Sequence, residues 1–323
     1  MTLLQVDGLT KTFPVRRTTL DILRGRTVQR LQAVTDVSLS VGRGETLGIV
    51  GESGCGKSTL ARCLVRLLTP DRGTVRFGDT DALALSGDAR RAFNRRVQMV
   101  FQDPYGALNP RLSVGAALAE ALLVHRIVPR RDVPARVRHL LDLVHLPADA
   151  AHRYPHEFSG GQRQRVGIAR ALAVEPALIV ADEPVSALDV SVQAQVVNLF
   201  VELQDRLGLA LVFITHDLRL VRHIAHRTAV MYLGRVVEIG PTEALFTAPG
   251  HPYTQALIVA VPDAVPGQRR AHPAVQGELP SNLELPPGCP FHPRCPRAEA
   301  VCYTERPALM SRNQDWPVAC HFG

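Results

Sequence analysis

The chain has 323 residues, enough for one large domain and an appendage, and 46% of them are apolar while 21% are charged. This composition is typical of an ordinary globular protein and excludes a disordered chain. The apolar runs are shorter than the roughly 18 residues of a membrane span, and the basic residues behind the net charge of +7 are scattered without aromatic partners. We therefore expect neither a membrane-spanning segment nor a nucleic-acid partner.

Strand and helix patterns alternate over residues 1–250. Short apolar runs followed by polar residues predict buried strands, and the spacing of apolar residues predicts a helix over Ser58–Leu68. Such an order indicates an α/β fold whose parallel strands bind ligands beyond their carboxyl ends. A mostly helical insertion is expected over about 106–176. The expected strands are Thr46–Val50, Val97–Phe101, Ala177–Ala181 and Ala210–Ile214.

The segment after the first of these strands fits the pattern G-x-x-x-x-G-K-[ST] of a phosphate-binding loop. Its glycines let backbone N–H groups point at a phosphate, and the next helix presents its positive end to the same anion. Lys57 can reach the β- and γ-phosphates of ATP, and Ser58 can ligate Mg²⁺. Cys55 is interpreted as a small filler. The loop consists of Gly51, Glu52, Ser53, Gly54, Cys55, Gly56, Lys57, Ser58 and Thr59.

An acidic pair follows the strand expected at Ala177–Ala181. Asp182 is predicted to hold Mg²⁺ through its water shell, and Glu183 to orient or deprotonate the attacking water. Together with the phosphate loop, this pair predicts a nucleoside triphosphatase and nothing narrower.

Phe158-Ser159-Gly160-Gly161-Gln162 resembles the signature sequence of ABC ATPases, with phenylalanine in the place of the usual leucine. It opens a helix and so offers a second anion-binding end. One chain uses two phosphate clamps at separate places only if the second serves a partner's nucleotide, as in the head-to-tail dimers of this family. The resemblance implies that Ser159, Gly160, Gly161 and Gln162 contact ATP bound on the facing subunit.

Four further positions match motifs of the family in the expected order. Phe13 matches the aromatic residue that stacks on adenine, although an ordinary core phenylalanine is the alternative. Gln102 resembles the Q-loop residue that senses Mg²⁺ and the membrane partner. Asp189 matches the D-loop residue that communicates across the dimer, and His216 the switch histidine that contacts the γ-phosphate. The resemblance covers roughly residues 3–250 and implies a P-loop, RecA-like fold with β-rich and helical subdomains.

Gln102–Arg111 and His251–Leu257 closely resemble the dipeptide/oligopeptide importer branch. Residues 103–111 lie where that family docks the coupling helix of the membrane subunit, with a plain loop cap as the alternative. The extra segment between Phe13 and Ala33 suggests the second of the two ATPase subunits that such importers often carry, the DppF/OppF-like type. Nickel importers and some glycoside importers share these sequence features, so they are the alternatives to a peptide importer.

The resemblance also implies the partners of this chain. These are a second ATPase subunit, identical or homologous, two transmembrane permease subunits and an extracytoplasmic solute-binding protein. The expected location is the cytoplasmic face of the cell membrane, because no signal-peptide pattern follows Met1. A soluble ABC ATPase of translation or DNA repair is disfavoured, because the chain has a single cassette and no coiled-coil insertion. An exporter subunit is disfavoured by the importer-type tail.

Prolines recur throughout residues 251–323, which predicts an irregular C-terminal extension after an ATPase domain at 1–250. This extension carries four cysteines, and a cytosolic chain should not rely on disulfides, so their thiolates suggest a tetrahedral zinc site or a four-cysteine iron–sulfur cluster. The family resemblance favours a 4Fe–4S cluster over Zn²⁺. Free or disulfide-forming cysteines, or a redox sensor, are the alternatives. The cysteines are Cys289, Cys295, Cys302 and Cys320.

Overall fold

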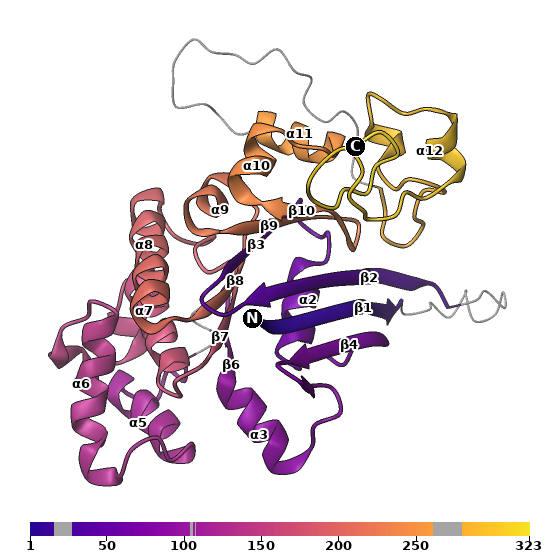
Figure 1. Cartoon of the computed structure of the whole chain (residues 1–323). Helices are drawn as coiled ribbons and strands as arrows, with labels where there is room; N and C mark the ends of the chain where they lie inside the picture. The colour runs from indigo at the N-terminus through magenta and orange to yellow at the C-terminus, as the bar shows by residue number, and fades with distance from the viewer. Residues whose placement is uncertain (16–27, 104–105, 107, 261–279) are drawn as a thin grey trace, which may run out of the picture. The chain divides into compact units, whose positions relative to one another are not determined.

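The computed structural model describes residues 1–15, 28–103, 106, 108–260 and 280–323. Strands and helices alternate along these residues (Figure 1). The chain divides into two compact units. No helix in the described ranges has both the length and the apolar character needed to cross a bilayer. The first unit comprises Met1–Leu3, Val41–Thr46 and Ala84–Thr215, and the second comprises Leu4–Ser40, Leu47–Leu83 and His216–Gly323.

Three parallel strands form the ladder of the first unit. They are β6 (Val97–Val100), β7 (Leu178–Asp182) and β8 (Ala210–Ile214), with β7 between the other two. Every residue of β7 and β8 is buried, as continuous apolar strands covered on both faces require. The strands expected here from the sequence are confirmed, with ends that differ by at most one residue.

Helices fill most of the rest of the first unit. α3 (Gly87–Arg96) precedes β6, and α5 (Val114–Val124), α6 (Val133–Leu143) and α7 (Gly160–Leu172) contact one another (Figure 1). The Ser113 hydroxyl caps α5 by accepting a hydrogen bond from Ala116 N–H. α8 (Val190–Leu207) packs on α7 and ends at Gly208 in the left-handed conformation.

Two ladders form the second unit. The first runs in the order β2-β1-β4-β5, and its antiparallel β1–β4 pair aligns Leu4 with Phe77. In the second, β3 pairs in parallel with β9, and β9 pairs antiparallel with β10. The bounds are β1 (Thr2–Pro14), β2 (Arg30–Gly42), β3 (Thr46–Val50), β4 (Arg72–Phe77), β5 (Thr80–Asp81), β9 (Arg227–Tyr232) and β10 (Arg235–Pro241).

Short helices accompany these strands. α2 ends at Leu64, earlier than the predicted Leu68, because Arg66 adopts a left-handed conformation and the N–H of Leu67 turns back to the carbonyl of Arg62. The helices are α2 (Lys57–Leu64), α9 (Leu218–Ile224), α10 (Thr242–Thr247), α11 (Pro252–Val259) and α12 (Ala300–Thr304).

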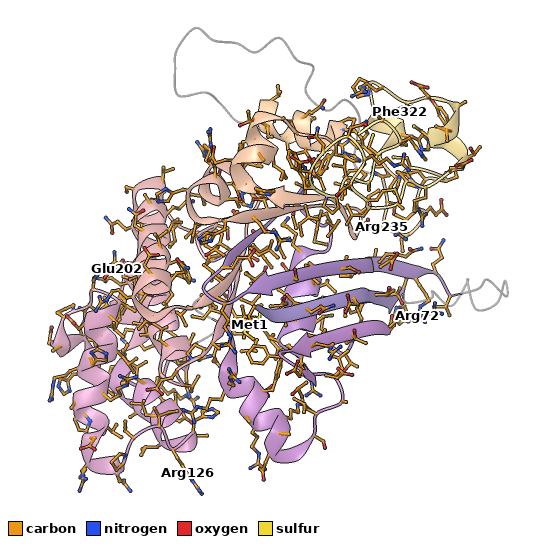
Figure 2. The ribbon with its side chains drawn as sticks, viewed as in Figure 1. Met1, Arg72, Arg126, Glu202, Arg235 and Phe322 are labelled. Carbon is orange, nitrogen blue, oxygen red and sulfur yellow. The ribbon has the colours of Figure 1, made fainter. Side chains whose placement is uncertain are left out.

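Residues 280–323 belong to the second unit and form no long helix or strand. Phe291 and Trp316 are buried in one cluster with Tyr232 and Tyr253. The buried carboxylate of Glu238 accepts hydrogen bonds from the indole N–H of Trp316 and from the backbone N–H groups of residues 250 and 251. Aromatic packing and one satisfied carboxylate therefore hold this segment in place. Figure 2 shows its side chains, with Phe322 labelled near the end of the chain.

Candidate functional site

The phosphate loop joins β3 to α2, so it lies between a buried strand and a helix N-terminus. Gly51 and Gly56 have φ values of 154° and 104°, which side chains rarely allow. A Cβ on Gly56 would overlap the carbonyl oxygen of Ala33, and one on Gly51 the carbonyl oxygen of Met231. Only glycine fits at these two positions, because the neighbouring backbone occupies the space of a side chain.

Lys57 is buried within this loop and is only 4% exposed. Its Nζ donates hydrogen bonds to the carbonyl oxygens of Gly51 at 2.7 Å and Glu52 at 3.0 Å. The buried thiol of Cys55 lies 3.9 Å from the same ammonium group. Burial raises the pKa of this thiol although Lys57 lowers it, so Cys55 stays protonated and acts as a small apolar filler.

Phe13 lies near the end of β1, and the Nζ of Lys11 is 5.6 Å from the centre of its ring. Asp71 fixes this strand end by accepting hydrogen bonds from Lys11 Nζ and from the N–H of Thr12. Burial alone would raise the pKa of Asp71, but the bonds from Thr12 and Lys11 lower it. Asp71 therefore supports the predicted adenine-binding position. Motif reasoning missed Asp71, because it lies far from Phe13 in the sequence.

The acidic pair lies at the end of β7. Asp182 is buried there, and Glu183 leaves the strand with φ of 44° while its N–H donates to the carbonyl of Ile214. The side-chain amide of Gln102 donates to Glu183 Oε2 at 3.3 Å. The structure thus brings together two residues that the sequence predicted separately, and the left-handed backbone at Glu183 re-aims its carboxylate.

The signature segment opens α7 with a capping box. The Ser159 hydroxyl accepts from the N–H of Gln162, and the side chain of Gln162 accepts from the N–H of Ser159. Phe158 is buried, and the guanidinium of Arg153 lies 4.3 Å from the centre of its ring. The unusual phenylalanine therefore anchors the entry to the helix.

The glycines of this segment pack closely against residues around Asp189. A Cβ on Gly160 would lie 3.1 Å from Leu188, and one on Gly161 would overlap the side chain of Val192. Asp189 itself caps α8 through its carbonyl, which accepts from the N–H groups of residues 192 and 193. Leu188 and Val192 were missed by sequence reasoning, since apolar contacts of this kind have no motif.

A buried glutamine connects α7 with the strand that precedes Gln102. Gln164 donates a hydrogen bond to the carbonyl of Phe101 at 3.4 Å. In the first unit, hydrogen bonds and packing thus connect Gln102, Glu183, the signature helix and the residues around Asp189. Some residues that the sequence analysis singled out lie outside the described residues. They are 104, 105 and 107 of the segment 103–111, residues 16–27 of the extra segment after Phe13, and Pro262, Pro266 and Pro273 of the tail.

His216 belongs to the second unit, as do Phe13 and the phosphate loop. It directly precedes Asp217, which caps α9 by accepting from the N–H of Arg219 at 2.9 Å.

The four late cysteines line one small pocket together with Phe291 and His251. Their thiols are free, and burial raises the pKa of Cys289 to about 11. Among the residues that the structure describes, no group of three or more His, Cys, Asp or Glu side chains could hold a metal ion. The predicted zinc or iron–sulfur site therefore gains no support from a preformed ligand set.

Two family models match this chain. One is described as ABC transporter and matches residues 34–186, and the other as Oligopeptide/dipeptide transporter, C-terminal region, over residues 237–302. A protein of Sinorhizobium fredii, named as a probable peptide ABC transporter ATP-binding protein, is 51% identical over 99% of this chain and 89% of its own length. The chain belongs to the ATP-binding proteins of ABC transporters.

Further relatives agree with this assignment. A Brucella ovis protein named for peptide import and ATP binding is 48% identical over 95% of this chain and 93% of its own. A dimeric ATP-binding cassette solved with ADP and Pi in a post-hydrolysis state covers 74% of this chain and 98% of its own, with 28% identity and a TM-score of 0.63. A Clostridium perfringens subunit of an ABC transporter complex covers 76% of this chain and 91% of its own, with 27% identity and a TM-score of 0.64. This ABC transporter ATP-binding protein is an ATPase with the cassette fold, as predicted.

Proposed function

We propose that this chain is the motor subunit of an importer for dipeptides and oligopeptides. The observation that carries the proposal is the match of residues 237–302 to the C-terminal region of oligopeptide/dipeptide transporters, on the same chain as the cassette. Relatives named for peptide transport support the same cargo. The functional division proposed from this is an ATPase domain at 1–250 and a transporter-type extension at 251–323.

In this proposal the second unit binds ATP. Phe13 stacks on the adenine, the backbone N–H groups of the phosphate loop bind the phosphates, and Lys57 contacts the β- and γ-phosphates. The glycine backbone and the ammonium held inside the loop support these roles. His216 is proposed to contact the γ-phosphate.

The first unit supplies the hydrolytic carboxylate. Glu183 orients or deprotonates the attacking water, and the bond from Gln102 sets the direction of its carboxylate. Ser58, Gln102 and Asp182 are proposed to hold Mg²⁺, which neutralises phosphate charge when it is bound. Mg²⁺ sites are usually completed by water and substrate phosphates, so one buried carboxylate, Asp182, is a sufficient protein anchor.

The working unit is proposed to be a dimer of ATPase subunits, identical or homologous. Ser159, Gly160, Gly161 and Gln162 then contact the nucleotide of the facing subunit, and Asp189 communicates between the two. The dimeric cassettes among the similar structures support this arrangement.

Two permease subunits and an extracytoplasmic solute-binding protein are proposed to complete the importer, with this chain at the cytoplasmic face of the membrane. Residues 103–111 are proposed to dock the coupling helix of a permease. The bond from Gln164 to the carbonyl of Phe101 gives α7 a direct connection to the start of that segment. Movement at the permease and at the signature helix can therefore be transmitted through the same residues.

We also propose that the tail holds an iron–sulfur cluster on Cys289, Cys295, Cys302 and Cys320. The proposal rests on the four thiols that line one pocket, because a cluster is ligated by four separate cysteines, and the described residues do not hold these thiols as a preformed metal-ligand group. Anaerobic purification followed by iron and acid-labile sulfide analysis tests it. Colourless, iron-free protein that has never met oxygen would reject the cluster.

The test of the importer is uptake of labelled dipeptides, longer peptides and Ni²⁺ by cells that carry either wild-type protein or Glu183→Gln. Loss of a positioned base slows hydrolysis by roughly 10²-fold or more, so peptide uptake should collapse while ATP binding persists. Glu202→Gln, which alters an exposed glutamate of α8 paired with Arg206 and labelled in Figure 2, is the matched control. Loss of Ni²⁺ uptake alone would replace peptide by nickel as the cargo, and normal peptide uptake would reject the peptide assignment.

A further inference from the structure

Three side chains from beyond residue 250 contact the phosphate loop. The hydroxyl of Tyr253 accepts a hydrogen bond from the N–H of Glu52 at 2.9 Å. The side-chain amide of Asn282 donates to the carbonyl of Gly54 at 2.9 Å. Arg294 donates two hydrogen bonds, each of 2.9 Å, to the two carboxylate oxygens of Glu52. Glu52 and Gly54 of the phosphate loop are thus held by a distant part of the chain.

The contact made by Arg294 is the strongest of the three. Its guanidinium forms a two-pronged pair with a carboxylate, which is stronger and more directional than a neutral hydrogen bond. The Arg294 side chain is only 7% exposed and that of Glu52 25%, so water screens the pair weakly. Burial alone would lower the pKa of Arg294, but its bonds to Glu52 raise it, and the arginine is always charged.

Aromatic packing fixes the position of Arg294. Its N–H donates to the carbonyl of Phe291, whose ring lies 5.3 Å from the ring of Tyr232 and 5.4 Å from that of Tyr253. The guanidinium itself lies 5.8 Å from the centre of the Tyr232 ring. Since these rings belong to the buried cluster on β9 and α11, the arginine is set by the core and does not move as a free surface side chain.

The contact between Arg294 and Glu52 has two consequences for a loop that binds the negatively charged phosphates of ATP. The carbonyls of Gly51 and Glu52 hold the Lys57 ammonium, so a loop braced at Glu52 keeps that ammonium in place. The carboxylate of Glu52 would repel ATP phosphates if it were unpaired, and Arg294 neutralises it. Both effects act on ATP binding and not on the chemistry of hydrolysis.

We propose that Arg294 is a positioning residue of the ATP site, through which the C-terminal extension braces the phosphate loop and neutralises Glu52. The proposal rests on the proposed role of this loop in ATP binding. The C-terminal extension thereby increases the affinity of the chain for ATP, in addition to any role in transport.

The test is titration of the purified full-length chain with a fluorescent ATP analogue and Mg²⁺. Arg294→Ala leaves the Glu52 carboxylate unpaired, and we expect about tenfold weaker binding or more, with a loss that shrinks as salt rises. Glu52→Gln/Arg294→Ala removes both charges and should recover most of the affinity. A residue needed only for folding would not show this recovery.

The matched control is Arg222→Ala, because Arg222 forms the same two-pronged pair with Glu243 on the exposed surface of α9 and α10. It should bind the analogue as tightly as wild type. If Arg294→Ala does not fold, Arg294→Lys, which keeps the charge and loses the fork, should bind more weakly than Arg222→Lys. Wild-type affinity in folded Arg294→Ala, or a double variant no better than the single one, would overturn the proposal. A wild-type chain that fails to bind the analogue would instead overturn the ATP site itself.

Discussion

Two helices of this protein begin at glycine-containing segments, and their first turns are built in opposite ways. α2 follows Gly56, which has no side chain to cap the helix and has φ of 104°. α7 follows Ser159, whose hydroxyl forms a capping box with Gln162. The start of α2 thus depends on backbone geometry and on Lys57, whereas side chains of α7 already satisfy part of its own first turn.

This difference suggests a division of work between the two ends. A first turn without a capping side chain can present its N–H donors directly to a phosphate. At α7 an incoming phosphate would compete with the bonds between Ser159 and Gln162, which agrees with the proposal that this helix meets a nucleotide bound on a partner subunit. We therefore expect ATP affinity to depend on α2 and hydrolysis to depend on both helices.

The largest effect on ATP affinity is expected for Lys57→Ala. The change removes a buried ammonium from the phosphate loop, and the isolated chain should lose at least about tenfold in ATP affinity. Titration with a fluorescent ATP analogue measures this, with Ser159→Ala as the control that keeps wild-type affinity. Equal losses in the two variants would remove the distinction between the helices.

Gly56→Ala should have the largest effect on the stability of the chain. The added methyl group overlaps the carbonyl of Ala33, and the left-handed backbone adds strain, so we expect a loss of about 3 kcal/mol or more in the free energy of unfolding. Gly54→Ala is the control, since its φ is 79° but nothing lies within 4 Å of the added carbon, and strain alone should cost about 1 kcal/mol. Urea unfolding measures both, and similar losses would contradict the role of Ala33.

Ser159→Ala is expected to cost about 1 kcal/mol of stability, which is typical of a lost helix cap. In the assembled transporter it should also abolish most ATP hydrolysis. Ser113→Ala removes the equivalent cap of α5, so it should destabilise the chain by a similar amount and leave hydrolysis unchanged. Normal hydrolysis in Ser159→Ala would reject its contact with the partner's nucleotide.

The smallest effect concerns a third helix start, the Asp217 cap of α9. Burial alone would raise the pKa of Asp217, but its bonds with Arg219 lower it overall. A carboxyl whose pKa is lowered by folding adds stability above its unfolded value of about 3.9, and this is lost as the pH falls through the folded pKa.

Asp217→Asn keeps the capping acceptor and removes the charge. Wild type should therefore exceed this variant in stability by about 0.5 kcal/mol at pH 7 and lose that advantage on acidification below pH 4. Urea midpoints measured across this range give the comparison, and an advantage that grows as the pH falls would contradict the sign.

Much of the fold was predictable because its signals are local. The strand Ala210–Ile214 was predicted to the residue, since a short continuous apolar run followed by polar residues indicates a buried parallel strand. The end of α2 was predicted four residues too late, because the apolar spacing continues to Leu68 while the backbone turns at Arg66. Apolar periodicity does not record such a change in backbone conformation.

The sequence by itself determined the phosphate loop, the acidic pair and the signature segment. Each is a run of adjacent residues, so the loop was predicted from its spacing, the acidic pair from its place after a strand, and the signature segment from its resemblance to ABC ATPases. Only the tertiary structure decided that Gln102 bonds Glu183 and that Gly160 lies against Leu188. It also decided that Arg294 pairs with Glu52, 242 residues away. Packing of the buried cluster creates this last pair, and no local pattern encodes a contact between side chains so far apart in the chain.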